Sequence, residues 1–243
     1  NKPVMGMVSG SIDASVATFD TKQVEVALNL PLGEKLAARV SGFWSSNDSV
    51  WRNVLPAGSG GISPGGEDIG DQETFAGRVQ FLYQVSDTFD LRLTYSEASQ
   101  DLSESPWMSL GATVETDSQG RVVGSEFTPA TIFGFIPPDI DDRKVSKDFA
   151  LSDLNRFDTD STTLHINKQW GDLELVSVTS YSNYEKTFML DVDSSPVNFS
   201  AFGNVSDTET FAQEVRLSGG KDKFIWTTGI YYLDITAENA HGI

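Results

Sequence analysis

The chain has 243 residues, a formal net charge of −18 and a pI near 4.3. This acidity argues against nucleic-acid binding, which needs lysine and arginine side chains to neutralise phosphates. The absence of cysteine excludes a disulfide framework and a thiolate metal site, and two histidines leave little material for histidine chemistry.

Nine segments are predicted as β-strands, because apolar and polar residues alternate in them and β-branched and aromatic residues are frequent. Along the second segment, Val24, Val26 and Leu28 share one face, while Gln23 and Glu25 lie on the other. In chain order the segments span approximately residues 5–18, 22–30, 35–45, 73–85, 89–98, 159–170, 173–185, 208–218 and 224–238.

The connections between these segments alternate between short turns and long loops. The short turns are residues 31–34, 86–88, 171–172 and 219–222, and the long loops span roughly residues 45–72, 99–158 and 186–207. A soluble sandwich has no reason to place every long loop at one end, whereas a transmembrane barrel has short periplasmic turns and long extracellular loops. The sequence contains no run of about 18 apolar residues, so no transmembrane helix is predicted. The loop lengths therefore favour a barrel.

Charged residues inside the strand segments support the same fold class. Buried in a sandwich core they would be costly, but in a wide barrel they face a wet lumen while the apolar residues face lipid. Soluble sandwiches also alternate, with their polar face in water, so alternation alone does not decide. Together with the loop lengths it predicts an all-β, antiparallel, up-and-down transmembrane barrel. The charged residues in question are Glu25, Arg39, Arg78, Arg92, Glu214 and Arg216.

Several stretches carry a resemblance to a known family through their order and spacing. They lie at residues 1–3, 20–32, 36–43, 210–218 and 226–232. In this order they resemble, in a TonB-dependent outer-membrane receptor, the exit of the N-terminal plug, the first hairpin, the third strand and two successive mid-barrel strands. No single motif is strict, because barrel signals are weak in each segment.

The resemblance implies a barrel of about 22 strands around a plug. Such receptors import scarce nutrients, such as ferric siderophores or cobalamin, with energy that TonB delivers through the plug. We expect residues 1–243 to be the N-terminal part of that barrel, a fragment of about nine strands without the plug and the remaining strands. An open sheet edge is not viable in lipid, so the fragment alone is expected to transport nothing. The implied partners are the lipid of a Gram-negative outer membrane, TonB by way of the plug, and a small-molecule ligand such as a ferric siderophore.

No catalytic constellation is present, and we predict neither an enzyme nor a cofactor. The resemblance implies that extracellular loops and the plug hold the ligand, often through aromatic and arginine side chains. The candidates are Trp51, Arg52, Trp107 and Phe133, although each also suits packing within its own loop. The long loops are net acidic, which favours a neutral or cationic ligand over an anionic ferric siderophore.

Two further sets of residues are assigned by the same reasoning. Arginines on the lumen side, namely Arg39, Arg78, Arg92 and Arg216, are predicted to meet carboxylates of the plug. Acidic loop residues resemble the ligands that calcium prefers, but they lack an EF-hand pattern and such runs are usually solvated, so we predict no metal site. These acidic residues are Asp139, Asp141, Asp142, Asp191 and Asp193.

A different class of protein is an alternative. The acidic charge, the polar alternate faces and the aromatic-bearing loops also suit a secreted, soluble all-β binding or adhesion module. That alternative predicts that the 243 residues fold alone and stay monomeric without detergent.

Overall fold

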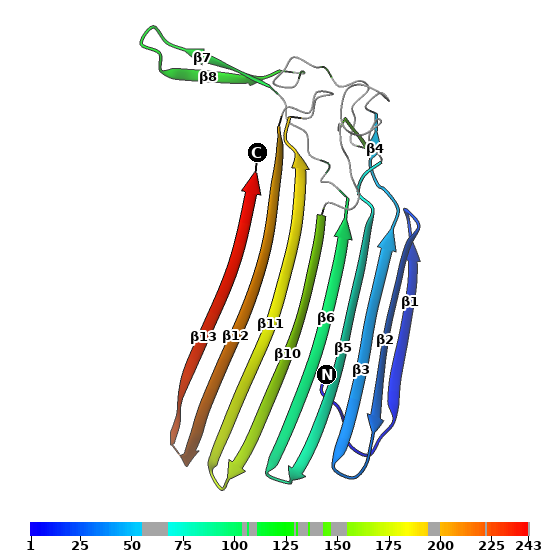
Figure 1. Cartoon of the computed structure of the whole chain (residues 1–243), viewed down its shortest axis with the longest axis vertical. Helices are drawn as coiled ribbons and strands as arrows, with labels where there is room; N and C mark the ends of the chain where they lie inside the picture. The colour runs from blue at the N-terminus through cyan, green and yellow to red at the C-terminus, as the bar shows by residue number, and fades with distance from the viewer. Residues whose placement is uncertain are drawn as a thin grey trace.

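A large antiparallel sheet dominates the computed structural model (Figure 1). The structure describes residues 1–54, 68–103, 106, 111–128, 130, 136, 143–146, 155–193, 200–221 and 223–242. Among these residues the sheet has nine strands in the order β1-β2-β3-β5-β6-β10-β11-β12-β13. Their bounds are β1 Ser9–Ala17, β2 Thr21–Pro31, β3 Leu36–Asn47, β5 Gln72–Ser86, β6 Phe89–Leu102, β10 Asn155–Trp170, β11 Leu173–Asp191, β12 Ala201–Lys221 and β13 Phe224–Gly242. No helix in this part of the chain has the length and apolarity needed to span a membrane.

Each strand pairs antiparallel with its neighbour in the chain, so the sheet is an up-and-down meander (Figure 1). The β2–β3, β5–β6, β10–β11 and β12–β13 connections lie at one end, which we call the short-turn end. The long β3–β5, β6–β10 and β11–β12 connections lie at the opposite end, which we call the loop end. The predicted separation of short turns from long loops is therefore confirmed. One short connection, at residues 18–20, closes the β1–β2 hairpin at the loop end.

The nine predicted segments correspond to the nine strands, but several strands reach further toward the loop end. β11 continues to Asp191 and β12 starts at Ala201, both several residues beyond the predicted limits. Polar residues interrupt the apolar alternation there while the hydrogen-bond ladder continues, for example between Lys186 and Ser206. β1 starts only at Ser9 rather than at residue 5.

One face of the sheet, which we call the apolar face, carries a continuous band of large uncovered side chains. Residues opposite each other in an antiparallel pair share a face, and Val40, Val79 and Tyr95 are neighbours of this kind. The side chains of Val40 and Tyr95 are 44% and 43% exposed, and the side chain of Val79 is partly exposed. Among the described residues the buried hydrophobic side chains are Ala37, Ala38, Ile69 and Val145. Within the part of the chain that the structure describes, no second layer therefore covers this face of the sheet.

The apolar band crosses the hydrogen-bonded rows at an angle. One row of directly paired residues is apolar at its β2 end and acidic at its β12 end, and it runs Val24, Trp44, Phe75, Ser99, Asp158, Glu185, Asp207. A row nearer the short-turn end is apolar at both ends, from Leu36 and Tyr83 to Val215 and Ile230. The band thus moves toward the short-turn end from β2 to β13. Such a shift is expected for strands tilted by about 35–45° in a barrel wall.

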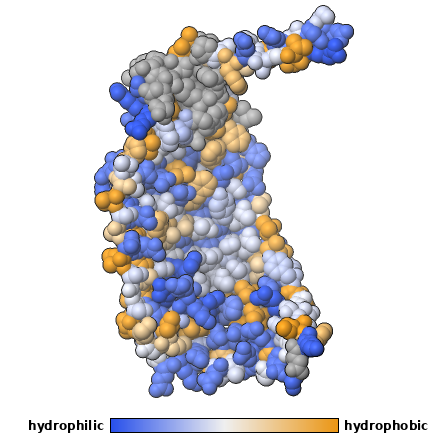
Figure 2. Space-filling model, turned by 180° about the vertical axis from the view of Figure 1, so that it is seen from behind, coloured by the Kyte–Doolittle hydropathy of each residue, from blue (hydrophilic) through white to orange (hydrophobic). Residues whose placement is uncertain are grey.

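The opposite face, which we call the polar face, carries all six charged residues singled out in the sequence. The register places them on the same side, for example Arg39 opposite Gln80, and Arg92 opposite His165. The Ser96 and Ser161 hydroxyl oxygens lie 2.9 Å apart across β6 and β10 on this face. Figure 2 looks onto a broad face whose middle is mostly hydrophilic or intermediate, with hydrophobic side chains toward the lateral margins.

Two smaller elements lie at the loop end. β4 (Arg52–Asn53) pairs in parallel with β9 (Lys144–Val145), joining the first long loop to the second. β7 (Ala112–Thr116) and β8 (Val122–Phe127) form a hairpin that extends sideways beyond the large sheet (Figure 1). The long loop at residues 99–158 therefore contains short strands of its own.

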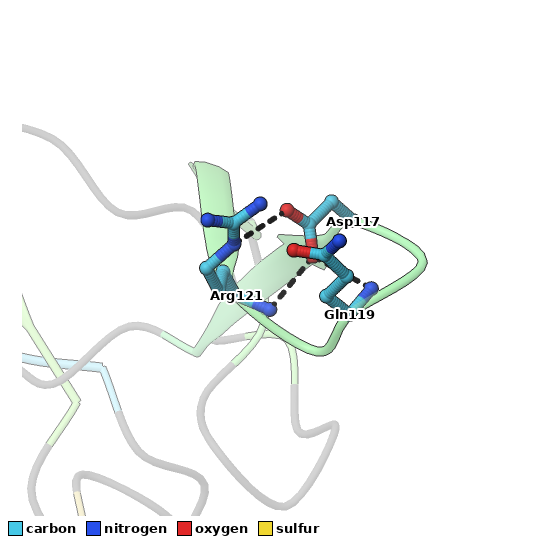
Figure 3. A network of polar contacts seen from close by, with 3 residues as sticks. All are labelled: Asp117, Gln119 and Arg121. Atoms are coloured by element: carbon cyan, nitrogen blue, oxygen red, sulfur yellow. Dashed lines mark hydrogen bonds and ion pairs between the residues drawn. The ribbon is translucent and has the colours of Figure 1, made fainter.

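The tip of the β7–β8 hairpin is held by the Asp117 carboxylate (Figure 3). Its Oδ1 accepts the backbone N–H groups of Gln119 and Arg121, both at 2.9 Å, and its Oδ2 accepts the Arg121 Nε–H at 3.0 Å. Gly120 has φ +74°, which a residue with a Cβ adopts only with strain. The Asp-x-x-Gly sequence therefore suits this tight turn.

We predict that the order of this tip depends on pH. The backbone N–H of Arg121, followed by that of Gln119, lowers the pKa of Asp117 below its ordinary value of 3.8. The stabilisation is therefore fully present above pH 3.8 and is lost as the pH falls through the lowered pKa. Hydrogen exchange at the Arg121 amide should quicken relative to its intrinsic rate between about pH 4 and pH 2. Asp117→Asn should remove this pH dependence, and an unchanged profile in that variant would contradict the assignment.

Candidate functional site

A pocket of about 430 Å³ lies at the loop end. It contains Trp51 and Arg52, two of the four residues predicted to contact ligand, together with residues from the β1–β2 turn and from β9. Trp51 and Arg52 thus line one cavity, and six further residues complete its lining. The lining residues are Phe19, Ser49, Val50, Trp51, Arg52, Asp68, Arg143 and Lys144.

A small apolar cluster supports this pocket. The Trp51 ring packs against Ile69 and Val145, which are 0% and 3% exposed. The backbone reinforces the contact, because the N–H groups of Val50 and Trp51 both donate to the Ile69 carbonyl oxygen at 2.9 Å. Trp51 is thus anchored by packing while its strand neighbour Arg52 stays exposed. The two candidates therefore have different surroundings in the same cavity.

Cations outnumber carboxylates among the described residues that line the pocket. Arg52, Arg143 and Lys144 contribute three positive charges there, and Asp68 contributes one negative charge. The β4–β9 pairing brings these cations together, and the Arg52 N–H donates to the Arg143 carbonyl oxygen at 2.9 Å. Asp68 is held by the Asn53 N–H, which donates to its Oδ1 at 2.8 Å. The charge of this described lining thus differs from that of the long loops as a whole, whose net acidity predicted a neutral or cationic ligand.

Backbone strain occurs at the rim of the same pocket. Phe19 and Asp20 have φ values of +60° and +48°, in the left-handed region that is unfavourable for residues with a Cβ. The Phe19 carbonyl oxygen accepts the Asp48 N–H at 2.8 Å, and the Arg143 guanidinium carbon lies 6.0 Å from the Phe19 ring centroid. These contacts hold the ring at the pocket. Both residues occupy the centre of the β1–β2 turn, where positive φ at two successive positions is typical of a type I′ hairpin turn.

Sequence reasoning missed Phe19, Asp68, Arg143 and Lys144. No local pattern singles them out, because the pocket depends on pairing between segments about 90 residues apart in the chain. Trp107 and Phe133, the other two candidates, lie outside the described residues. So do Asp139, Asp141 and Asp142.

The remaining acidic candidates lie at the base of the β11–β12 loop. Asp191 and Asp193 are 0% and 1% exposed. The Asp193 N–H donates to Asp191 Oδ1 at 3.0 Å, and the Ser200 N–H donates to Asp193 Oδ2 at 2.7 Å. These carboxylates therefore close the base of the loop. Within the described ranges, no group of three or more His, Cys, Asp or Glu side chains has an arrangement that fits a metal ion.

A second hollow, of about 450 Å³, lies over the polar face. Glu25, Phe43, Arg78 and Ser161 line it, from β2, β3, β5 and β10. Arg78 is one of the arginines predicted to face a plug. The hollow shows that the polar face offers a charged, concave surface to whatever lies in front of it.

Comparisons with known proteins identify the fold. No protein-family model matches the chain, and no curated protein matches it. Among solved structures, the ferric yersiniabactin uptake receptor FyuA from Yersinia pestis matches 99% of the chain with a TM-score of 0.66 and 16% identity. The ferripyoverdine receptor of the Pseudomonas aeruginosa outer membrane, bound to ferripyoverdine, matches 98% with a TM-score of 0.62 and 11% identity. The siderophore receptor PiuA from Acinetobacter baumannii matches 96% with a TM-score of 0.60 and 13% identity.

The chain spans about a third of the length of these receptors, at 32%, 28% and 30% respectively. At such low identity the likeness establishes the fold. The predicted fold, part of the barrel of a TonB-dependent receptor, is therefore confirmed.

Proposed function

We propose that this chain forms part of the wall of a TonB-dependent receptor in the outer membrane of a Gram-negative bacterium, and that the receptor imports a small ligand. The observation that carries the proposal is the continuous, uncovered apolar face on a sheet with this fold. A band of this kind exposed to water would be a strong aggregation liability, whereas it suits hydrocarbon. The oblique course of the band supports a tilted barrel wall.

The polar face supports the second half of the proposal. In a barrel of this kind it faces the interior, where the charged hollow around Arg78 would meet a plug domain. Arg39, Arg92 and Arg216 lie on the same face. We propose that these arginines contact plug carboxylates, and that TonB acts on the receptor through that plug. Nothing in this arrangement assigns an enzymatic role.

The ligand is proposed to bind at the loop-end pocket. Three cations and two aromatic rings around about 430 Å³ suit a small anionic ligand with an unsaturated or apolar part. A ferric siderophore is the proposed type, and the names of the solved relatives point to the same class. Trp51 and Arg52 remain the ligand contacts that we propose from the described residues.

Reversing one charge in the pocket tests the ligand class. Arg52→Glu in the complete receptor should weaken binding of an anionic ferric siderophore roughly tenfold, since Arg52 is exposed and partly screened. Equilibrium titration with ferric siderophores of different net charge measures this. Lys22→Glu is the matched control, because Lys22 is an exposed loop-end cation that does not line the pocket. An equal loss in both variants would contradict a specific contact at Arg52.

The receptor assignment itself is tested by the coding DNA on both sides of this segment. We expect a signal peptide and a plug domain upstream, and further strands downstream that bring the barrel to about 22. A start codon directly before Asn1 and a stop codon directly after Ile243 would overturn the proposal. They would favour the secreted soluble module instead. No specific observation favours that alternative, and the uncovered apolar face counts against it.

A further inference from the structure

The N-terminal segment, residues 1–8, crosses the polar face near the short-turn end instead of extending β1. We call it the strap. One side chain, Asn29 of β2, holds it with three hydrogen bonds. Asn29 Nδ2 donates to the carbonyl oxygens of Val4 at 2.9 Å and Met7 at 2.7 Å, and Asn29 Oδ1 accepts the Val4 N–H at 2.8 Å. Both the Nδ2 donor and the Oδ1 acceptor of the Asn29 side chain thus bind backbone groups of residues that belong to no strand.

Burial on the polar face follows the strap. Asn29 and Ala37 are 0% exposed and Gln80 is 8% exposed, and their register places all three on this face in adjacent strands. Pro3 is also fully buried. Most of the polar face is half-buried or exposed, so burial here marks where the strap covers the wall.

The strap leads away from the sheet edge and over its middle. Figure 1 draws the N-terminus within the outline of the central strands rather than beside β1. The buried side chains Asn29, Ala37 and Gln80 belong to β2, β3 and β5, so the strap crosses several strands of the wall.

We propose that Asn29 is the positioning residue that fixes this strap to the wall, and that it sets where the N-terminal plug of the receptor joins the barrel. This proposal rests on the proposed function for the plug, although the clamp itself does not. A buried amide without its partners would leave three polar groups unsatisfied, so the clamp favours one path for the chain. The strap then directs the preceding chain into the interior at the short-turn end.

Hydrogen exchange in the complete receptor tests the clamp. Among the described residues, the hydrogen bond of the Val4 N–H goes to Asn29 Oδ1, and Val4 lies in no strand that would protect its amide. We expect it to exchange slowly in the unaltered receptor and roughly tenfold faster or more in Asn29→Ala. Gln23→Ala is the matched control, since Gln23 is an amide on the same face of the same strand and should leave Val4 unchanged. Amides of β3 and β5, followed in the same experiment, show whether the sheet is intact.

Two further outcomes decide the positioning role. The 243 residues contain no cysteine, so Lys2→Cys adds a single reactive thiol to the strap. Asn29→Ala should speed the labelling of this thiol by a hydrophilic maleimide. If the plug is no longer correctly positioned, vancomycin should also leak through the receptor. Fast exchange at Val4 in the unaltered receptor, or slow exchange in Asn29→Ala with an intact sheet, would overturn the clamp. Lost protection at Val4 with normal exclusion of vancomycin would overturn the positioning role. A coding sequence without a plug would reject the proposed function separately, whatever the exchange rates are.

Discussion

The substitution Val215→Arg is expected to prevent stable assembly of the sheet in a membrane. Val215 lies in the apolar band, opposite Ser177 and Ile230, and its side chain is 39% exposed. In a barrel wall this position faces hydrocarbon, where an arginine near the midplane costs about 2–4 kcal/mol. This is a large fraction of the stability of an ordinary domain. The expected result is a strong fall in folded receptor in the outer membrane, measured by heat modifiability and by urea unfolding in vesicles.

The matched control for this change is Ala212→Arg. Ala212 lies on the polar face of the same strand, opposite Ser180 and Leu233, and Glu214 is two residues away on that face. An arginine there remains in contact with water and near a carboxylate, so folding should be close to normal. If both variants folded equally well, the apolar face would not contact lipid. If the 243 residues stayed soluble and monomeric without detergent, the soluble alternative would be supported.

Gly70→Val is expected to disrupt the apolar cluster that supports the pocket. Gly70 has φ +96°, and a Cβ built there would lie 2.5 Å from Trp51 Cε3. A β-branched residue in the left-handed region and a side-chain clash each cost about 1–3 kcal/mol, so the contact between Trp51 and Ile69 should be lost. Exchange at the Trp51 and Arg52 amides should rise, and ligand affinity should fall further than in Arg52→Glu.

Gly33→Val gives the comparison for Gly70→Val. Gly33 lies in the β2–β3 turn at the short-turn end, and a Cβ there meets nothing within 4 Å. The same change in residue type should therefore leave the pocket amides and ligand affinity unaltered. Unchanged exchange at Trp51 in Gly70→Val would show that the cluster around Ile69 does not depend on this glycine.

The sheet was predictable because its signals are local and repeated. Alternation in segments such as 22–30 and 73–85 identifies both a strand and its two faces, and turn residues such as Gly171 mark the short-turn end. Strand ends near the loops were less predictable. There the ladder continues through polar pairs such as Asp207 and Glu185, where no apolar alternation remains.

The pocket was only partly predictable, since a contact between distant segments leaves no period in the sequence. Trp51 and Arg52 were chosen as candidates by residue type alone, and both line the pocket. Arg143 and Lys144 reach the pocket through the β4–β9 pairing, which joins two different long loops. The Asn29 clamp has the same character, because an asparagine within a strand pattern does not reveal that its partners are 22 and 25 residues earlier.

Because neighbouring strands alternate in direction, the number of strands determines how the two edge strands are oriented. Nine strands alternate in direction in the described sheet, so β1 and β13 both run from the short-turn end to the loop end. These two edges cannot pair with each other in an antiparallel ladder. In the proposed barrel, the strands that complete the cylinder must therefore be odd in number, and the first and last of them must run toward the short-turn end. A second copy of this sheet would meet that requirement only upside down, with its long loops at the opposite end of the cylinder.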